Sequence, residues 1–563
     1  MTFRTPGRPR DAEAQRRGRA PRRLTAAAGA AVLALATTAC AGGNGGYLGG
    51  GGDGGLIRAS WGDPQHPLEP ANTNEVQGGK VLDMIFRGLV HYNPETGRAE
   101  NAVAQSIDTE DQRNFTIRLK DGWTFSDGTP VTAKSFTDAW NYGAAGENAQ
   151  VASYFFQFIE GYDEVHPAES GARPTARTLR GLHVVDDHTF TVRLTRPFSL
   201  WPQTLGYTAY APLPRSFFED HDAWLAKPVG NGPYRIDSYQ PGQRMTLVAN
   251  EDYAGEDKPR NDGVELRVYT DNNTAYTDLQ AGNLDLIDDV PAARLGNVEN
   301  DLGDRYVNQP AGILQTVSFP LYDRDWSGRS AAKVRQGLSM AINREEITSR
   351  LYHGTRTPAG DFTSPVLGDA GGYRADLCGD VCAYRPRRAR ELIEEGGGLP
   401  GGHVTLTSNV DTGSHRQWMD AVCHSINNVL DDSDACTVNP VPTFADFRNR
   451  ISQRRMTGMF RTGWQMDYPL IQNFLQPLYY TNGSSNDSGY HNEEFDQRID
   501  QANARPTQRE AVRDFQEAER MLVDDLPAIP LWYQNGTAGY SERLSNVRLN
   551  PFSVPVFTDI EVS

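Results

Sequence analysis

Pairs of adjacent acidic residues are the first feature of this 563-residue chain that could carry out chemistry. Two carboxyl groups that face each other can cleave a glycosidic bond. The acidic pairs here are neighbours in sequence, at Asp186-Asp187, Asp288-Asp289, Asp431-Asp432 and Asp524-Asp525. Neighbouring side chains point to opposite faces of a strand and do not face each other on a helix. We therefore interpret these acids as solvated surface groups.

Signatures of the common enzyme classes are missing from the sequence. It contains no G-x-S-x-G, no phosphate-binding P-loop, no G-x-G-x-x-G after a strand and no H-E-x-x-H. The 11 histidines are scattered, and His183 and His188 lie five residues apart, which does not place them on one helical face. We expect no catalysis, no metal site and no obligatory cofactor.

Four cysteines lie in the second half of the chain, at Cys378, Cys382, Cys423 and Cys436. An even number of cysteines in an exported chain favours disulfides. Of the three possible connectivities we prefer the local one, Cys378–Cys382 and Cys423–Cys436. A zinc site is the alternative, although no pair of histidines lies near Cys378 and Cys382.

The first 40 residues have the pattern of an export signal. Eight arginines lie between Arg4 and Arg23, and an apolar run follows from Leu24 to Ala36. A helix of about 13 residues reaches about 20 Å, which is too short to cross a bilayer. The run ends in Thr37-Thr38-Ala39-Cys40, which resembles a bacterial lipobox, with Thr37 at the position where leucine is usual.

Cys40 is therefore expected to be lipidated. Two acyl chains on this cysteine give stable anchoring, and the Gly-rich residues 41–55 suit a flexible tether. The chain is then expected at the extracytoplasmic face of the cell membrane. The alternatives are a signal that is cleaved elsewhere and a short buried helix, and the export route, general secretory or twin-arginine, stays open.

Length and charge narrow the class of protein. A chain of 563 residues exceeds one ordinary hydrophobic core, so two or three domains are expected. The net charge is −17, and removing the net +6 of the leader leaves −23. Such an acidic protein is a poor candidate for nucleic-acid binding, which requires basic patches.

Hydrophobic periodicity predicts alternating short strands and amphipathic helices, an α/β pattern. Residues 115–120 alternate apolar and polar, and Thr132 can cap a helix with Phe136, Ala139 and Trp140 on one face. Further helices are predicted at 77–88, 274–281, 332–351, 385–396, 415–430 and 507–524. Further strands are predicted at 189–194, 233–239, 244–249, 264–270 and 528–534, and residues 282–287 are predicted to form a tight turn and a buried strand. No linker is obvious, so the domains are expected to be discontinuous, with a ligand cleft between them.

Five segments together resemble the family 5 solute-binding proteins of ABC transporters, which bind oligopeptides, dipeptides or nickel. They are residues 114–136, Gly230-Asn-Gly-Pro-Tyr-Arg235, Leu279-Gln-Ala-Gly-Asn-Leu-Asp285, residues 334–344 and Leu526-Pro-Ala-Ile-Pro-Leu-Trp-Tyr533. They occur in the order of the family and span most of residues 56–563.

One further segment is similar to the oligopeptide-binding branch, Arg461-Thr-Gly-Trp-Gln-Met-Asp-Tyr468. The resemblance implies that Asp467 pairs with the α-ammonium of a peptide and that Arg461 lies near its carboxyl end. It also implies that Gly463 and Gln465 offer backbone groups to the peptide and that Trp464 forms a wall. The stretch Asn74-Glu75-Val76 resembles the family segment that flanks the ligand from the other side.

The implied fold is α/β, a two-lobed periplasmic-binding type with an extra inserted domain. We expect lobe one at 56–92, 210–312 and 534–563, the inserted domain at 93–209, and lobe two at 313–533. The implied function is an oligopeptide-binding lipoprotein, a monomer that delivers its ligand to the permease of an ABC transporter. The alternatives are an oligosaccharide or metal chelate as ligand, and a surface hydrolase or chaperone on the same scaffold.

Overall fold

The computed structural model describes residues 55–563 except 74, 169–170 and 412–413. The expected signal peptide, Cys40, most of the tether and Asn74 lie outside the described residues. Within the described residues, no helix combines the length and the apolar character needed to cross a bilayer.

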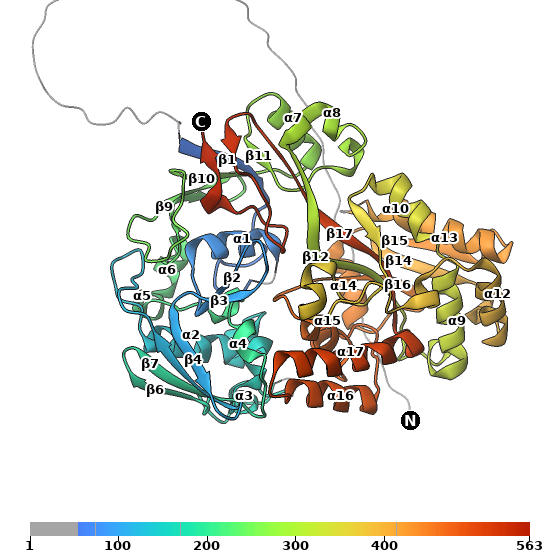
Figure 1. Cartoon of the computed structure of the whole chain (residues 1–563), viewed down its shortest axis with the longest axis horizontal. Coiled ribbons are helices and arrows are strands. Elements are labelled where there is room, and N and C mark those ends of the chain that lie inside the picture. The colour runs from blue at the N-terminus through green and yellow to red at the C-terminus, as the bar shows by residue number, and fades with distance from the viewer. Residues whose placement is uncertain (1–54, 74, 169–170, 412–413) are drawn as a thin grey trace, which may run out of the picture. The chain divides into compact units, whose positions relative to one another are not determined.

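A mixed eleven-stranded sheet runs through the described chain (Figure 1). Its strands lie in the order β15-β14-β16-β12-β17-β11-β1-β10-β9-β8, and β13 pairs with β17. The bounds are β1 (Leu56–Trp61), β8 (Tyr234–Gln240), β9 (Arg244–Ala249), β10 (Gly263–Val268), β11 (Leu286–Ile287), β12 (Tyr306–Ser318), β13 (Arg356–Pro358), β14 (Val404–Asn409), β15 (Cys436–Val441), β16 (Met459–Gln465) and β17 (Ala528–Tyr540). The predicted strands at 189–194, 233–239, 244–249, 264–270 and 528–534 are confirmed, and the last is six residues longer than predicted.

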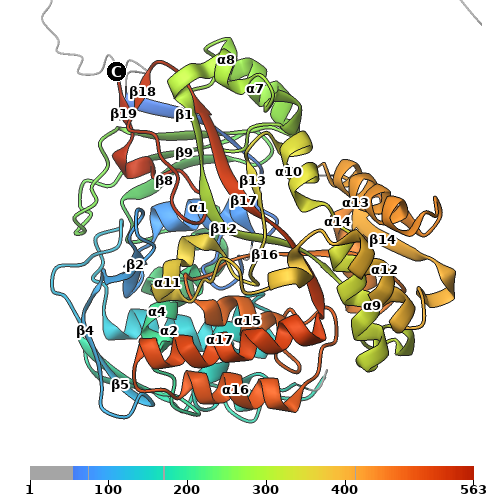
Figure 2. The ribbon, with the colours of Figure 1, turned by 45° about the vertical axis from the view of Figure 1, so that its right-hand side comes forward.

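Two long antiparallel strands, β12 and β17, join the two parts of this sheet (Figures 1 and 2). The C-terminal end of β17 pairs with β11, and the C-terminal part of β12 pairs with β16. A bulge interrupts the register between Pro310 and Ile313, opposite Asn535 and Gln534. The lobe boundaries expected at 312/313 and 533/534 fall at this bulge, where a strand bends most easily, and they stay a prediction.

A second sheet has the order β4-β5-β7-β6 and lies within the expected inserted domain. Its strands are β4 (Ala104–Thr109), β5 (Asn114–Leu119), β6 (Leu182–Asp186) and β7 (Thr189–Arg193). The helix predicted after Thr132 is confirmed as α2 (Ala133–Ala144), and it buries Phe136, Ala139 and Trp140. The backbone N–H of Thr132 donates to Ser135 Oγ at 3.1 Å, which closes the first turn.

Most of the other predicted helices are confirmed within a few residues. They are α1 (Val76–Ile85), α7 (Asn272–Gln280), α12 (Pro386–Glu395), α13 (His415–Leu430) and α17 (Gln508–Asp525). Further helices include α14 (Phe444–Ser452), α15 (Ile471–Tyr479) and α16 (Glu493–Asn503). Figures 1 and 2 both show α16 and α17 side by side.

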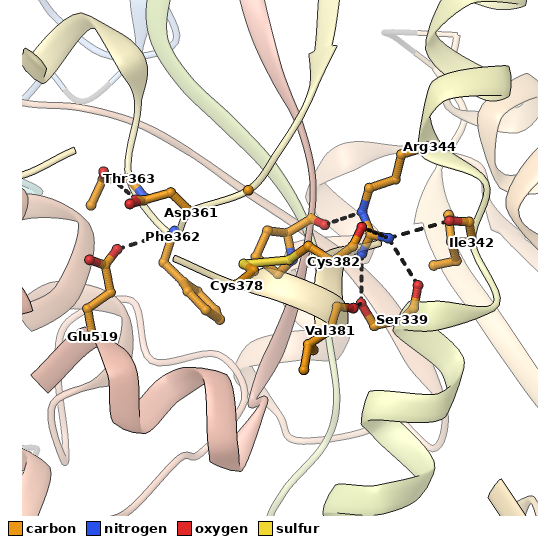
Figure 3. Close-up of a disulfide and its surroundings, with 12 residues drawn as sticks. Ser339, Ile342, Arg344, Asp361, Phe362, Thr363, Cys378, Val381, Cys382 and Glu519 are labelled. Atoms are coloured by element: carbon orange, nitrogen blue, oxygen red, sulfur yellow. Dashed lines mark hydrogen bonds between the residues drawn. A yellow bond between two sulfur atoms is a disulfide. The ribbon is translucent and has the colours of Figure 1, made fainter. Parts of the chain in front are cut away.

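The single helix predicted at 332–351 is wrong. The structure has two helices, α9 (Gly328–Met340) and α10 (Arg344–Tyr352), and the side chain of Asn343 caps the second. The buried guanidinium of Arg344 donates to the carbonyl oxygens of Pro530, Ser339 and Cys382 (Figure 3). These contacts satisfy carbonyl groups where the helix is interrupted. The apolar periodicity of the sequence continues across this break and therefore does not reveal it.

Two disulfides link cysteines that are close in sequence, Cys378 with Cys382 (Figure 3) and Cys423 with Cys436. The second ties α13 to β15. Across the described part of the chain, no group of three or more His, Cys, Asp or Glu side chains could hold a metal ion.

Candidate ligand-binding site

Two cavities meet at Asp467. The larger has a volume of about 440 Å³ and is bordered by α1, by the strand β2 (Val90–Tyr92), by Gln465, Met466 and Asp467, and by the C-terminal segment 548–559. The smaller, of about 270 Å³, is bordered by Asp467, by α15 and by side chains of the expected inserted domain. Asp467 lies two residues beyond the end of β16 and borders both cavities.

A neighbouring side chain fixes the position of this carboxylate. Asn473, in the first turn of α15, donates from Nδ2 to Asp467 Oδ2 at 2.9 Å. The backbone N–H of Asp467 and the indole N–H of Trp464 both donate to Asn473 Oδ1, at 2.8 Å and 2.9 Å. One asparagine therefore orients both the acid and the tryptophan that the sequence singled out.

The pKa of Asp467 is raised to about 7 by desolvation, and the hydrogen bond from Asn473 opposes this shift. Among the described residues, no Lys or Arg forms an ion pair with Asp467. A desolvated carboxylate without a counter-ion is unfavourable, so the site favours a guest that brings a positive charge.

Four tyrosines surround the carboxylate. Desolvation together with the charge of Asp467 raises the pKa of all four hydroxyls, which belong to Tyr92, Tyr154, Tyr207 and Tyr468. Phe155 stacks on Tyr207 with ring centroids 4.1 Å apart. Aromatic faces attract cations and carboxylates bind ammonium groups through charge-assisted hydrogen bonds, so the arrangement can hold an ammonium group.

The strand leading to Asp467 has a free edge. β16 pairs with β12 from Phe460 to Gln465, but on its other side it pairs with β14 only at Met459 and Phe460. Among the described strands, nothing covers that second edge from Arg461 to Gln465. An extended guest can pair there as an added strand.

The predicted residues on this strand have different surroundings. Gln465 borders the larger cavity and donates to the carbonyl of Phe552 at 2.8 Å. Gly463 is exposed and Trp464 is half-buried, and together with Arg461 they border neither of the two cavities.

Arg461 lies in a separate positive region. Its Nε donates to Gln315 Oε1 at 3.2 Å, and burial together with Arg448 lowers its pKa to about 10. Burial and the charge of Arg461 lower the pKa of the nearby His415 to about 4. Within the described chain no carboxylate pairs with Arg461, so this region can accept an anion.

Glu75 and Val76 border the larger cavity from the opposite side. The carboxylate of Glu75 accepts from the N–H of Gly78 at 2.8 Å and caps α1, so that side chain is engaged in the fold. Val76 is 44% exposed and offers an apolar contact. Asn74, the third predicted residue of this segment, is outside the described residues.

Sequence reasoning missed Asn473, His415 and the tyrosines of the site. His415 is the first residue of a helix that was predicted, and this position could have marked it as a candidate site residue. An aromatic content of 10% is enough to line a pocket with rings, but it does not say which residues form that pocket. Tyr92, Tyr154 and Tyr207 come from three distant segments, and only the fold brings them together.

The chain is similar to known proteins of one bacterial family. The sequence model of a family described as bacterial extracellular solute-binding proteins, family 5 Middle, matches residues 98–486. The oligopeptide-binding protein OppA of Bacillus subtilis is 24% identical, over 85% of this chain and 88% of the relative. The dipeptide-binding protein DppE of the same organism is 24% identical, over 84% and 85%.

A solved structure of Haemophilus influenzae OppA in complex with RPPGFSPFR has a TM-score of 0.75 at 19% identity, covering 91% of this chain and 99% of that one. This likeness confirms the expected fold class, the two-lobed α/β fold of periplasmic binding proteins. Since the family match spans well over half of the sequence, the chain belongs to the family 5 bacterial extracellular solute-binding proteins.

Proposed function

We propose that this protein captures oligopeptides outside the cell and delivers them to an ABC-type permease for import. One observation carries the proposal: the desolvated carboxylate of Asp467 has no cationic partner in the described chain and lies at the end of the free edge of β16. A free peptide offers both an ammonium group and an extended backbone. The names of the relatives in Bacillus subtilis, oligopeptide-binding and dipeptide-binding, support the same ligand class.

Each end of the peptide has a partner in this proposal. The α-ammonium pairs with Asp467, and the main chain follows β16 past Gln465 and Gly463. Glu75 and Val76 flank the guest from the opposite side, and Trp464 forms a wall. The carboxyl end approaches Arg461, which pairs with no carboxylate in the described chain and can receive it.

Delivery requires a signal that the permease can read. We place the lobe boundaries at the bulge between Pro310 and Ile313 and at the facing part of β17. Closure of the lobes about β12 and β17 would cover the peptide and change the surface presented to the permease.

The export and anchoring steps rest on the N-terminal sequence. The basic and apolar segments ending at Cys40 direct export and lipidation, and the Gly-rich tether separates the binding unit from the membrane. The two disulfides suit an oxidising location outside the cytoplasm.

Calorimetric titration with the tripeptide Ala-Ala-Ala, a cello-oligosaccharide and a nickel chelate tests the proposal. We expect heat from the tripeptide alone, and mass spectrometry of ligand that co-purifies with the protein should identify peptides. Tight binding of the sugar or the chelate, with no heat from the tripeptide, would replace the peptide with that solute. Cleavage of the tripeptide during long incubation would instead indicate a hydrolase.

A further inference from the structure

We propose that the 270 Å³ cavity receives the first side chain of the bound peptide and selects an aromatic ring there. This inference rests on the proposed peptide-binding function. It adds a preference for one residue class at one position of the ligand.

The direction of the chain around Asp467 separates the two cavities. Residues just before it, Gln465 and Met466, border the larger cavity. Residues after it, Tyr468 and, in α15, Gln472, Asn473 and Gln476, border the smaller one. A peptide whose ammonium is at Asp467 and whose main chain follows β16 lies on the side of the larger cavity. The first side chain of the peptide leaves the Cα atom that carries the ammonium group, but in another direction. The smaller cavity is the space open to this side chain.

The smaller cavity has the size of a ring. An apolar cavity of about 150 Å³ holds one benzene molecule, so a volume of about 270 Å³ takes the side chain of Phe, Tyr or Trp with room for water. Rings border it on several sides, among them Tyr154, Phe158 and Tyr480. Aromatic side chains pack against one another in edge-to-face or offset geometry.

Several polar groups of this cavity already have partners within the protein. Arg196 forms an ion pair with Asp500, and the hydroxyl of Tyr480 donates to the same carboxylate at 3.2 Å. Gln472 accepts from the Tyr468 hydroxyl and donates to Gln476, both at 2.6 Å. A charged first side chain would therefore be desolvated without gaining a counter-ion, because the charge of Asp467 is taken by the ammonium.

The larger cavity fits this role less well. Its lining includes the ion pairs of Arg87 with Asp257 and of Arg548 with Asp559. The smaller cavity, by contrast, has only Arg196 and Asp467 as charged side chains among the described residues of its lining.

Calorimetric titration of the whole protein with X-Ala-Ala peptides tests the inference, where X is Ala, Lys, Phe or Tyr. We expect Phe-Ala-Ala and Tyr-Ala-Ala to bind about tenfold more tightly than Ala-Ala-Ala, and Lys-Ala-Ala to bind less tightly. Ala-Phe-Ala, with the ring at the second position, should bind like Ala-Ala-Ala.

Variants of Tyr480, which is half-buried, locate the selectivity. Tyr480→Leu should reduce the preference for Phe over Ala at the first position to less than about threefold, because it should weaken Phe-Ala-Ala binding more than Ala-Ala-Ala binding. Tyr480→Phe keeps the ring and should keep the preference. If Tyr480→Leu does not fold, Phe158→Leu replaces it, and a wild-type-like circular dichroism spectrum is the criterion.

The outcomes separate this inference from the proposed function. Binding of every free tripeptide with equal affinity would overturn the aromatic preference and leave peptide binding intact. A preference that survives both Tyr480→Leu and Phe158→Leu would overturn the assignment of the cavity. Failure of all free tripeptides to bind would overturn the proposed function itself.

Discussion

Asn473 holds Asp467 from two directions, since its amide nitrogen donates to the carboxylate and its amide oxygen accepts from the backbone N–H of the same residue. These hydrogen bonds span the turn between β16 and α15. The carboxylate is thereby fixed at the meeting point of two cavities before any guest arrives, and such preorganisation reduces the entropy lost on binding.

Removing this support should change the pH dependence of peptide binding. In Asn473→Ala the carboxylate loses the hydrogen bond that lowers its pKa, so we expect the pH midpoint of binding to rise by about one unit. Affinity measured at several pH values gives this midpoint. Asn439→Ala, on the exposed edge strand β15, is the matched control and should match the wild type. An unchanged midpoint in Asn473→Ala would show that Asn473 does not tune Asp467.

Wild-type affinity should pass through a maximum between about pH 7 and about pH 8. Below the pKa of about 7, Asp467 is protonated in the free protein, and each further unit of acidification should weaken binding about tenfold. Above about pH 8 the α-amino group of the peptide loses its proton. Calorimetric titration from about pH 5 to about pH 9 checks both limbs, and a flat profile between about pH 5 and pH 7 would contradict the role of Asp467.

A buried pair of carboxyl groups should make stability fall as the pH rises. Burial and the nearby Asp361 raise the pKa of Glu519, and both side chains are fully buried (Figure 3). The folded state keeps a proton that the unfolded state releases above the ordinary pKa of glutamate. The free energy of unfolding therefore declines by about 1.4 kcal/mol per pH unit between the unfolded and the folded pKa.

Glu519→Gln should remove this contribution. Chemical denaturation at several pH values should show a flatter pH dependence for the variant and equal or greater stability than the wild type at about pH 8. Glu517→Gln lies on the same helix with its side chain 44% exposed, and it serves as the control. A slope that is the same in Glu519→Gln and in the wild type would mean that the pair does not retain a proton.

The disulfide between Cys423 and Cys436 should contribute more stability than the one between Cys378 and Cys382. It closes the longer loop, with a sequence separation of 13 against 4. Loop-closure entropy predicts losses of about 3 and about 2 kcal/mol for the two double Cys→Ala variants. Denaturation of the oxidised variants measures both values, and equal stability of wild type and the Cys423→Ala/Cys436→Ala variant would refute the estimate.

Local patterns in the sequence predicted much of the fold. The helix at 415–430 and the strand at 244–249 have the predicted bounds, because apolar residues recur there with helical or strand periodicity. The break between Met340 and Arg344 escaped prediction, since Ala341 and Ile342 extend the apolar pattern through it. What ends the helix is tertiary: Arg344 reaches carbonyl groups of β17 and of the loop at Cys382.

The candidate site was predicted through motifs more than through physical patterns. Asp467 is one of 72 acidic residues, and composition alone does not distinguish it. Its desolvation depends on Tyr92, Tyr154 and Tyr207, which are more than 250 residues away in sequence. Long-range convergence of this kind leaves no local periodicity, so the raised pKa of Asp467 became visible only in the folded structure.

The proposed function requires the carboxylate of Asp467 to neutralise the amino end of a peptide. Calorimetric titration of free and N-acetylated Ala-Ala-Ala against the wild type and Asp467→Asn at about pH 7.5 tests it most directly. The wild type should prefer the free peptide by about thirtyfold or more, and Asp467→Asn should bind both within about threefold of each other. If Asp467→Asn keeps the full preference for the free peptide, the ammonium is recognised elsewhere and the role proposed for Asp467 is wrong.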